Sequence, residues 1–407
     1  MSNACMRNIG EVKNCFGCGV CATVCAKDAI KIVLNPDGFY APILDTNKCV
    51  DCGLCADVCA FLHDDLAVQN NPKQSFGAWS NNPMVRRRCS SGGVGYELGK
   101  HLLNEGYKVC AVKYNVSEQR AEHYIATNEQ EFIPSIGSKY IQSYTVDGFK
   151  AVNRKEQYLV TGTPCQIDSF RRYLKKFRVE DNFVLMDFFC HSVPSTLAWK
   201  KYLQIVEKKT GPVTYASWRN KFTGWHGSWA MVIDGDSDNV HDCNKVDWHD
   251  SYNIYISGKN HFYNSRLSQG DLFYKLFLGD YCCNPACQKN CKYKFDKSSA
   301  DIRIGDFWGQ TYSKDEEGVS SVIAFTDKGK ETLKQLDCTY EEHPFELVAE
   351  GQMKKNVEEA YTSAIIYNLL NNSTSDKLSF KLVFIMEFLL KLPKYIINKV
   401  KIVLWER

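Results

Sequence analysis

The chain has 407 residues, 44% of them hydrophobic and 24% charged, which is ordinary for a soluble globular protein of roughly two or three domains. The formal net charge of +3 gives no global reason to expect nucleic-acid binding. Nineteen cysteines behind an N-terminus with no apolar leader-like run favour a cytoplasmic metal-binding protein over a secreted disulfide framework.

Two cysteine-rich segments share the spacing C-x2-C-x2-C-x3-C: NCFGCGVCATVC at 14–25 and KCVDCGLCADVC at 48–59. The short x2 spacings let three thiolates surround one iron–sulfur cube, and the fourth cysteine of each segment reaches the other cube. We therefore predict two [4Fe-4S] clusters. Their ligands are Cys15, Cys18, Cys21 and Cys59 for one, and Cys49, Cys52, Cys55 and Cys25 for the other.

The sequence around these cysteines predicts an α+β ferredoxin-like domain over residues 1–64. Gly17, Gly19 and Gly53 lie between the ligands, where backbone N–H groups must approach sulfur closely. The segment at 29–45 is expected to form two short strands around an NPDG turn. Structural zinc is the alternative, but zinc sites pair two C-x2-C units at longer separations. This part of the chain resembles a bacterial-type two-cluster ferredoxin.

A polar, turn-rich linker is predicted at 65–88, followed by an α/β domain at 89–345. Strand and helix patterns alternate in that domain, which is typical of a mainly parallel sheet. The expected strands are KVCAVKY, QYLVTG and NFVLMDFFC. One helix is expected from Ser90 or Ser91 to about Asn104, and a second begins at Pro164. A third has Pro194 in its first turn and ends at Gly211. No G-x-G-x-x-G fingerprint supports a Rossmann dinucleotide site.

Three loops of this domain have the composition of ligand-binding turns. SSGG at 90–93 opens a predicted helix, whose N-terminus favours a phosphate. IGSKY at 136–140 combines a glycine, a hydroxyl, a cation and an aromatic ring. TGTPCQ at 161–166 follows a predicted strand, and ligands of α/β sheets bind at the carboxyl ends of strands. Taken singly, each loop is explained as well by a tight turn or a helix cap.

Together with CHSVPS at 190–195 and ADIRIGDFWG at 300–309, these loops in this order resemble the beta subunit family of coenzyme F-420 hydrogenases and dehydrogenases. The resemblance implies that the α/β domain binds FAD. It implies these residues near the flavin: Ser91, Gly92, Gly93, Ser138, Lys139, Thr161 and Gly162. Arg86, Arg87 and Arg88 are candidates for the pyrophosphate, or else a solvated basic face.

The same resemblance implies a third [4Fe-4S] cluster beside the flavin. The matching positions are Cys165, Cys190, Cys287 and Cys291. Relatives mostly have C-x2-C in the last pair, whereas this chain has C-x3-C, so Cys283 is an alternative ligand. The competing interpretation is that Cys165 and Cys190 are small buried hydrophobes.

Other residues of this domain have two interpretations each. His191 donates to a cluster sulfur or to the flavin, or it is a structural histidine. Arg219 and Lys221 are candidates for contact with an acidic substrate, whereas the tryptophans around them are expected to be core residues. Asp306 is expected to fix a turn through backbone N–H groups. The cysteines expected to be packing residues are Cys5, Cys89, Cys110, Cys243 and Cys338.

The C-terminal region, 346–407, is predicted to be helical, with a basic amphipathic tail of two helices separated by Pro393. The tail's apolar runs are too short to span a bilayer. Three surfaces fit the tail: the inner face of a membrane as a peripheral contact, a partner protein, or the protein's own body. Its basic residues are Lys381, Lys391, Lys394, Lys399, Lys401 and Arg407.

These features predict an FAD- and iron–sulfur-dependent oxidoreductase. It would pass electrons between a two-electron carrier, such as the deazaflavin coenzyme F-420, and a redox partner protein or soluble electron carrier. The alternatives are a non-catalytic electron-transfer subunit of a larger redox complex, a reductase of a specialised metabolite, and a zinc-stabilised binding protein. No catalytic residue, donor or acceptor is selected by the sequence.

Overall fold

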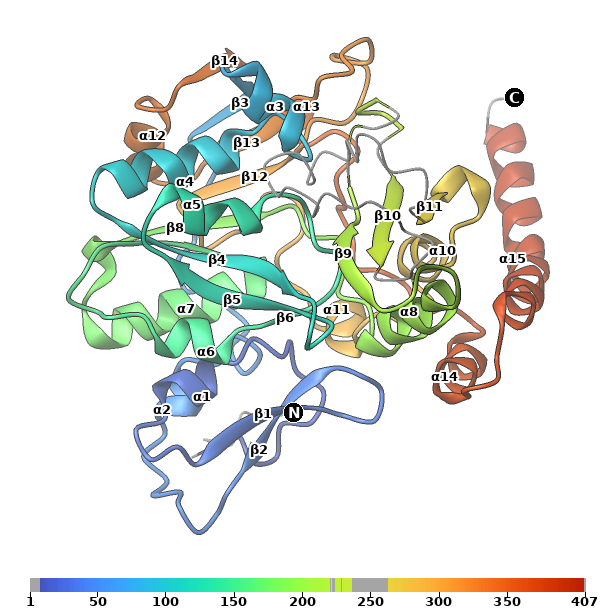
Figure 1. The fold of residues 1–407 in the computed structure, drawn as a ribbon, viewed down its shortest axis with the longest axis horizontal. Helices are drawn as coiled ribbons and strands as arrows, with labels where there is room; N and C mark the ends of the chain where they lie inside the picture. The colour runs from blue at the N-terminus through green and yellow to red at the C-terminus, as the bar shows by residue number, and fades with distance from the viewer. Residues whose placement is uncertain (1–7, 220, 222–223, 228, 236–262, 406–407) are drawn as a thin grey trace.

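The N-terminal part of the chain forms a small unit, drawn in blue at the bottom of Figure 1. The computed structural model describes residues 8–219, 221, 224–227, 229–235 and 263–405. The elements of the small unit are α1 (Val20–Val24), β1 (Ile30–Leu34), β2 (Tyr40–Leu44) and α2 (Leu54–Asp57). β1 and β2 pair antiparallel, with Ile30 opposite Leu44, which confirms the two strands predicted around the NPDG turn.

A large sheet forms the body of the protein. Its strand order is β14 (Cys338–Glu342), β3 (Gln74–Ser80), β13 (Ser320–Ala324), β12 (Ile302–Asp306), β8 (Phe183–Phe188), β7 (Tyr158–Thr161), β4 (Lys108–Asn115), β5 (Arg120–Ala126) and β6 (Ser143–Tyr144). The central strands β12, β8, β7 and β4 run parallel, as predicted. β13, β3 and β14 on one side and β5 on the other pair antiparallel, so the whole sheet is mixed.

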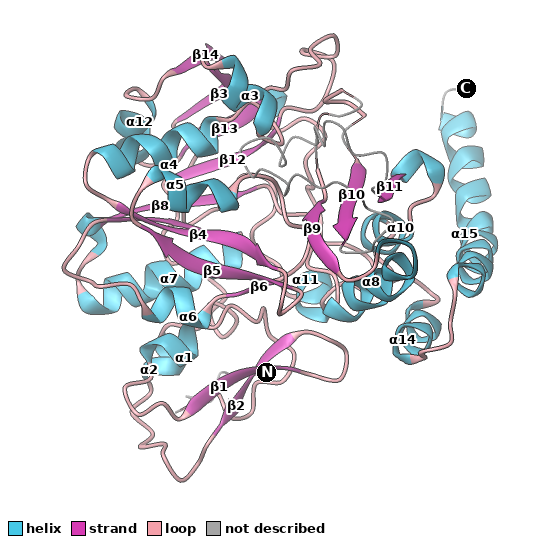
Figure 2. Ribbon diagram, in the orientation of Figure 1, coloured by secondary structure: helices cyan, strands magenta, loops and turns pink. Residues whose placement is uncertain are grey.

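Helices cover both faces of this sheet because its central strands are apolar on both sides (Figure 2). On β7, Leu159 shares a core with Leu98 of α4 (Val94–Asn104). The neighbouring Tyr158 and Val160 share a core with Phe170 of α7 (Pro164–Phe177). This alternation follows from the two-residue period of a strand. Both helices were predicted, and Pro164 occupies the first turn of α7 as expected.

A smaller antiparallel sheet lies beside the large one and contains β9 (Val213–Ser217), β10 (Ala230–Gly235) and β11 (Tyr263–Arg266). α8 (Thr196–Thr210) packs on it. Ser195 caps α8, so Pro194 precedes the helix instead of lying in its first turn as predicted, whereas Gly211 ends it as expected. The other helices of the body are α3 (Pro83–Arg88), α5 (Glu129–Phe132), α6 (Val146–Lys150), α10 (Leu272–Leu278), α11 (Pro285–Lys289), α12 (Asp327–Leu333) and α13 (Phe345–Val348).

The predicted linker at 65–88 is wrong for most of its length. β3 lies between β13 and β14 in the large sheet, and α3 follows it directly. β3 buries Ala78 completely. The polar residues on either side of β3 are the reason that the sequence predicts a linker here. The expected boundary after residue 345 is also crossed, since α13 packs against β3 and β13.

The small N-terminal unit shares a hydrophobic core with the body. Val20 and Val24 of α1 belong to the same buried cluster as Phe149 of α6 and Phe170 of α7. α1 also packs directly against both of those helices. This shared core fixes the first cysteine motif against one face of the large sheet.

The C-terminal region contains α14 (Ser363–Asn371) and α15 (Lys377–Trp405), drawn in red in Figure 1. The tail is one helix with Pro393 inside it, not two as predicted. A proline interrupts helical hydrogen bonding locally and often only bends a helix. Within the described residues, no helix is long and apolar enough to cross a membrane. The side chains of Lys394, Lys399, Lys401 and Arg407 lie outside the described part, as do Cys5 and Cys243.

Candidate functional site

Two loops with predicted site residues, those after β7 and β8, lie at one edge of the large sheet. β7, β8 and β12 run parallel, so their carboxyl ends lie together. Cys165 follows β7, Cys190 follows β8, and Trp308 follows β12. This is the edge at which α/β sheets bind ligands.

Four thiols gather beside α1, and we name them the inner thiol set: Cys15, Cys18, Cys21 and Cys59. They line one small cavity together with Phe16 and Phe61. Burial, with a smaller contribution from the neighbouring Cys18, raises the pKa of Cys15 to about 11 and that of Cys59 to about 12. Crowded buried thiols ionise readily only beside compensating positive charge, which bound iron would supply. The donor set therefore fits a cluster.

Backbone geometry around the inner set also suits a cluster. Gly17 has φ +65° and its N–H donates to Cys15 Sγ at 3.3 Å. Its Cα faces Tyr40 O so closely that a Cβ would lie 2.6 Å from that oxygen. Only glycine fits this approach, and N–H···S bonds of this kind are part of how proteins tune iron–sulfur clusters.

The remaining cysteines of the two motifs form the outer thiol set: Cys25, Cys49, Cys52 and Cys55. Cys52 raises the pKa of Cys55, after the larger effect of burial. Backbone N–H groups point at sulfur here too, from Ala29 to Cys25 at 3.4 Å and from Asp51 to Cys49 at 3.5 Å. Cys52 is exposed, so this set lies at the protein surface.

Four more thiols meet at the carboxyl edge, and we name them the third thiol set: Cys165, Cys190, Cys287 and Cys291. Burial raises the pKa of Cys287 to about 12, with further contributions from Cys190 and Cys291. Burial also raises the pKa of Cys165, followed by the effects of Cys287 and Cys190. The positions implied by the family resemblance are thus neighbours in space.

Cys283 lies next to this set but has other partners. Its Sγ is 3.0 Å from Ser192 Oγ and 3.7 Å from Asp280 Oδ1. After burial, the largest effect on its pKa comes from Cys282, and Cys287 contributes least. The geometry therefore favours Cys291 over Cys283 as the fourth member.

The inner and third thiol sets are adjacent. Cys18 is among the groups that raise the pKa of Cys165. The ring of Phe16 lies 5.8 Å from that of Tyr293 in an edge-on contact, and Asn284 Nδ2 donates to Cys15 O at 3.2 Å. Protein contacts thus join the two sets directly.

The SSGG and IGSKY loops touch, since Ser138 N–H donates to Ser90 Oγ at 2.9 Å. Ser91 Oγ donates to Val319 O at 2.7 Å, and Gly92 N–H donates to Ser320 Oγ at 3.0 Å. Gly93 has φ +88° and caps α4. These groups, expected near a flavin, are engaged with β13 and its preceding loop.

Lys139 and Thr161 also have partners within the protein. Lys139 Nζ donates to the carbonyls of Pro134, Ser135 and Ile136 at 3.2, 2.7 and 3.2 Å. Burial lowers the pKa of Lys139 to about 7, yet three acceptors match the three N–H groups of an ammonium. Thr161 Oγ1 donates to Cys110 O at 3.2 Å. Gly162 N–H donates to Met186 O at 3.2 Å.

Two basic residues beside the SSGG loop, Arg86 and Lys221, have partners within the protein. Arg86 pairs with Asp315 at 2.7 Å and with Glu317 at 3.1 Å. Lys221 Nζ donates to Ser91 O at 2.6 Å and also to Arg86 O. Both cations are thus engaged with the protein itself, whereas Arg87 is exposed, as the alternative of a solvated basic face expects.

Arg219 and Asp306 form a buried pair, with Nη2 and Oδ2 3.2 Å apart. The guanidinium lies between the rings of Trp229 and Trp308, 4.7 and 4.9 Å from their centres. Asp306 Oδ1 accepts from Trp225 Nε1 at 3.1 Å. The expectation that Asp306 binds backbone N–H groups is wrong, because its carboxylate instead binds the Arg219 guanidinium and the Trp225 indole N–H.

His191 interacts with Asp280, with Nε2 and Oδ1 2.8 Å apart, and its ring packs on Phe277. This supports the structural interpretation of the histidine. Lys294 Nζ donates to Cys190 O at 2.8 Å and lowers the pKa of that thiol, against a larger rise from burial. Sequence reasoning missed Lys294, which brings positive charge to the third thiol set.

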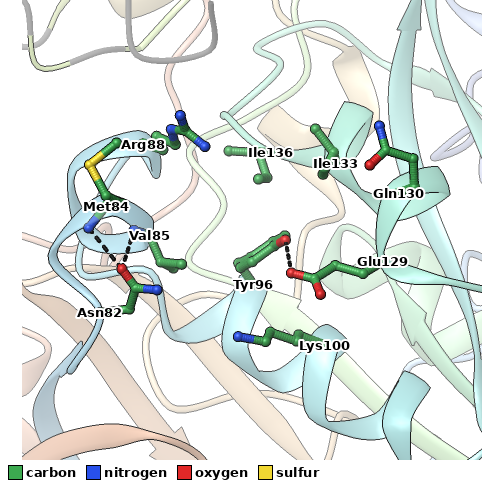
Figure 3. A pocket seen from close by; sticks show the side chains of 10 residues that line it. All are labelled: Asn82, Met84, Val85, Arg88, Tyr96, Lys100, Glu129, Gln130, Ile133 and Ile136. Carbon is green, nitrogen blue, oxygen red and sulfur yellow. Dashed lines mark hydrogen bonds between the residues drawn. The ribbon is translucent and has the colours of Figure 1, made fainter. Parts of the chain in front are cut away.

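A surface cavity of about 340 Å³ lies elsewhere, between α3, α4 and α5 (Figure 3). Arg88, Lys100 and Glu129 line it, and Tyr96 OH donates to Glu129 Oε1 at 2.7 Å. Among the described residues, its lining includes no cysteine, but it includes Arg88, a candidate for the pyrophosphate, and Ile136 of the IGSKY loop. This cavity therefore borders one of the loops expected near the flavin, and none of the three thiol sets lines it.

Three family models match the chain. The model described as "Coenzyme F420 hydrogenase/dehydrogenase, beta subunit N-term" matches residues 75–149, and the C-terminal model of the same family matches residues 155–344. The chain belongs to the coenzyme F420 hydrogenase/dehydrogenase beta subunit family. Its N-terminal part, residues 14–61, matches a 4Fe-4S dicluster domain. This member of the family thus carries an iron–sulfur domain ahead of the two family regions.

Among solved structures, the chain is similar to one in the F420-reducing [NiFe] hydrogenase complex from Methanosarcina barkeri, with 16% identity over 76% of this chain and 91% of that chain. The TM-score is 0.45, too low to support an argument about function. No curated protein matches this family member. Within the described residues, no three His, Cys, Asp or Glu side chains are arranged around a single metal ion.

Proposed function

We propose that this chain is an iron–sulfur flavoprotein oxidoreductase. It passes electrons between a two-electron carrier and a redox partner through FAD and three [4Fe-4S] clusters. Flavins exchange electrons in pairs and iron–sulfur clusters exchange them singly, so the two cofactors together convert one kind of transfer into the other.

The observation that carries the proposal is the contact between the third and inner thiol sets. Phe16, which lies between Cys15 and Cys18 in the chain, packs with Tyr293, Cys165 and Cys291 in one hydrophobic cluster. Clusters held at the third and inner sets would therefore be close neighbours within this one chain, and electrons could pass between them without a second protein. Lys294 beside Cys190 would offset part of the negative charge of a cluster there.

The outer thiol set is the proposed exit to a partner protein. Cys52 is exposed, and Val50 and Ile43 nearby in sequence are 61% and 57% exposed. An exposed apolar patch beside a surface cluster suits a transient redox partner. The order from inside to outside is then the third set, the inner set and the outer set.

The test is anaerobic purification followed by assays of iron, acid-labile sulfide and flavin, and an electron paramagnetic resonance (EPR) titration. The proposal expects three cluster signals and bound FAD. Iron and sulfide without FAD would leave the alternative, a non-catalytic electron-transfer subunit. A specific observation favours that alternative: the polar groups of the SSGG loop, including Gly92 N–H and Ser91 Oγ, already have protein partners. A colourless protein without sulfide would overturn both.

The candidate two-electron carrier is coenzyme F-420, because the family is named for it. Reduction of the purified protein by reduced F-420, followed as bleaching of its visible absorbance, tests this choice separately from the cofactor content. An inert F-420 with intact clusters and flavin would point to a different carrier.

We further infer that α15 lies on an anionic membrane surface. Phe380 and Val383 are buried in the core beside α8 and α10, which fixes one face of the helix. The rest of the helix exposes Leu378, Leu382, Ile385, Phe388, Leu389 and Leu390, each by 49–64% of its surface. Lys377 and Lys381 are exposed on the same helix, whereas Lys391 pairs with the buried Glu387 at 3.1 Å. Apolar side chains beside lysines suit the interface of anionic lipids.

A further inference from the structure

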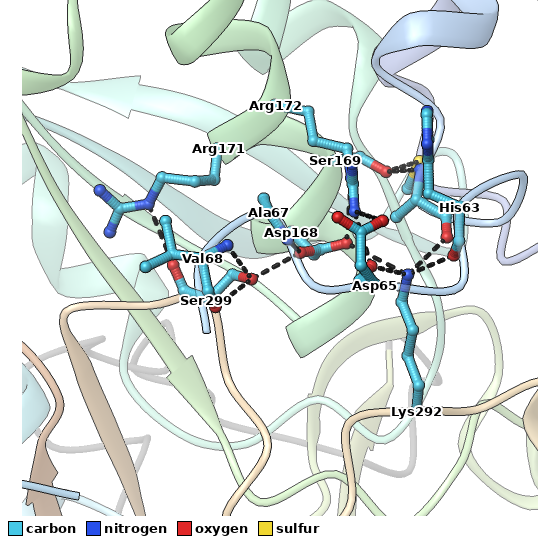
Figure 4. A network of polar contacts seen from close by, with 12 residues as sticks. His63, Asp65, Ala67, Val68, Asp168, Ser169, Arg171, Arg172, Lys292 and Ser299 are labelled. Carbon is cyan, nitrogen blue, oxygen red and sulfur yellow. Dashed lines mark hydrogen bonds and ion pairs between the residues drawn. The ribbon is translucent and has the colours of Figure 1, made fainter. Parts of the chain in front are cut away.

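Helix α7 joins the third thiol set to the inner one through a single face. Cys165, Asp168 and Ser169 lie at positions i, i+3 and i+4 of this helix and therefore point the same way. Cys165 belongs to the third set. Asp168 and Ser169 instead reach the N-terminal iron–sulfur unit and the segment after it (Figure 4).

Ser169 touches a sulfur of the inner set. Its Oγ lies 3.2 Å from Cys18 Sγ, and it accepts a hydrogen bond from Ala60 N–H at 3.0 Å. Ser169 is fully buried. A thiolate bound to iron has no hydrogen to donate. The oxygen of Ser169 already accepts a hydrogen bond from Ala60 N–H. The hydroxyl hydrogen of Ser169 is therefore available to the sulfur.

The neighbouring Asp168 holds this part of the helix in place. Its carboxylate accepts from Ala67 N–H at 2.6 Å and from Ser299 Oγ at 2.5 Å (Figure 4). It also accepts from Tyr293 OH at 3.0 Å. Lys292 Nζ lies 3.7 Å away and supplies positive charge. These contacts join three separate segments of chain, so the position of Ser169 relative to Cys18 is fixed by buried bonds on several sides.

We propose that Ser169 donates a hydrogen bond to Cys18 Sγ and thereby raises the reduction potential of the cluster at the inner thiol set. A reduced cluster carries one more negative charge than the oxidised cluster. A donor aimed at its sulfur stabilises that charge and favours reduction. Ser169 is thus a positioning and tuning residue, and the inference rests on the proposed cluster at the inner set.

The experiment compares Ser169→Ala with the parent by EPR-monitored redox titration of the full chain, with iron and sulfide measured on each sample. One reduction step should shift to lower potential in the variant while the others stay. The expected loss is about tenfold in the equilibrium constant for reduction, which is about 59 mV for a one-electron couple.

Two further variants separate tuning from folding. Ser169→Thr keeps the hydroxyl and should keep the parent potential. Thr23→Val is the matched control, because Thr23 Oγ1 lies on α1 and donates to Gly19 O at 3.3 Å instead of to sulfur. It should leave every potential unchanged.

The outcomes are distinct. A fully loaded Ser169→Ala with parental potentials overturns the inference, as does an equal shift in Thr23→Val. If Ser169→Ala loses the inner cluster, Ser169→Thr decides: a parental potential supports the inference, and a shifted one overturns it. A parent without clusters instead refutes the proposed function.

Discussion

Arg303 and Asp187 face each other on the adjacent parallel strands β12 and β8 and form two hydrogen bonds, each 2.7 Å long. Both side chains are fully buried. The remaining Arg303 donors reach Phe295 O at 2.8 Å and Lys297 O at 2.9 Å. The pair therefore shapes the loop that follows Cys291 and carries Tyr293 and Lys294.

Removing one half of this pair should be costly. In Asp187→Asn the buried guanidinium loses its counter-charge, and the free energy of unfolding should fall by about 3–5 kcal/mol. Chemical denaturation of the anaerobic protein measures the change. The matched control is Glu331→Gln, which breaks an exposed pair with Lys334 and should cost no more than about 0.5 kcal/mol. Equal losses in the two variants would contradict the assigned role.

The division of the N-terminal cysteines into inner and outer sets predicts which substitutions act alike. Cys59→Ser and Cys15→Ser should abolish the same EPR signal and about four iron atoms per chain, whereas Cys25→Ser should abolish the other. Cys110→Ala, a buried cysteine of β4, should keep all its iron. Loss of one signal by both Cys25→Ser and Cys15→Ser would show that the sets are divided differently.

The third thiol set makes a separate prediction about ligand choice. Cys287→Ser should lose a cluster signal, because Cys287 interacts with both Cys190 and Cys291. Cys283→Ser should retain that signal, since its thiol lies against Ser192. Iron analysis and EPR spectra of the two variants test this directly, and the reverse result would make Cys283 the ligand.

His123 should make stability depend on pH. Burial lowers its pKa from 6.5 to about 4, while its Nε2 donates to Thr161 O at 2.9 Å. Between these values the unfolded chain binds a proton that the folded chain does not. Stability should therefore fall as the pH drops from about 6.5 toward 4, by up to about 3 kcal/mol.

Denaturation of parent and His123→Gln at several pH values from 7 to 5 checks this expectation. In the variant, the free energy of unfolding should lack the part of its pH dependence that His123 causes, because the glutamine amide does not titrate. His101→Gln, at the surface of α4, should keep it. Identical slopes for parent and His123→Gln would exclude His123 as the cause.

The exposed side of α15 predicts binding to anionic lipid. The parent should sediment with phosphatidylglycerol vesicles, less with phosphatidylcholine vesicles, and less again at high salt. Substituting both Leu382 and Phe388 by Glu should abolish sedimentation. Leu34→Glu removes a partly exposed apolar side chain of β1 and serves as the control. Self-association that the double substitution abolishes, without vesicle binding, would identify a second copy as the occupant.

Local patterns in the sequence were enough for several elements. The NPDG turn, the capped start of α7 at Pro164 and the end of α8 at Gly211 each depend on residues within one turn of the feature. β3 escaped prediction because its partners β13 and β14 lie more than 200 residues away and decide its pairing. The predicted division of the tail at Pro393 is wrong because a proline can bend a helix without ending it.

The iron–sulfur motifs, the family and the alternation of strands and helices could be predicted from the sequence, since spacing and periodicity are properties of neighbours in the chain. The folded structure was needed to show that Cys165 packs against Phe16 of the first cysteine motif, that Ser169 reaches a sulfur, and that Arg86 and Lys221 have protein partners. Such contacts join segments distant in sequence. Their geometry is set by how α7 and the N-terminal unit pack on the sheet, and no local pattern encodes that packing.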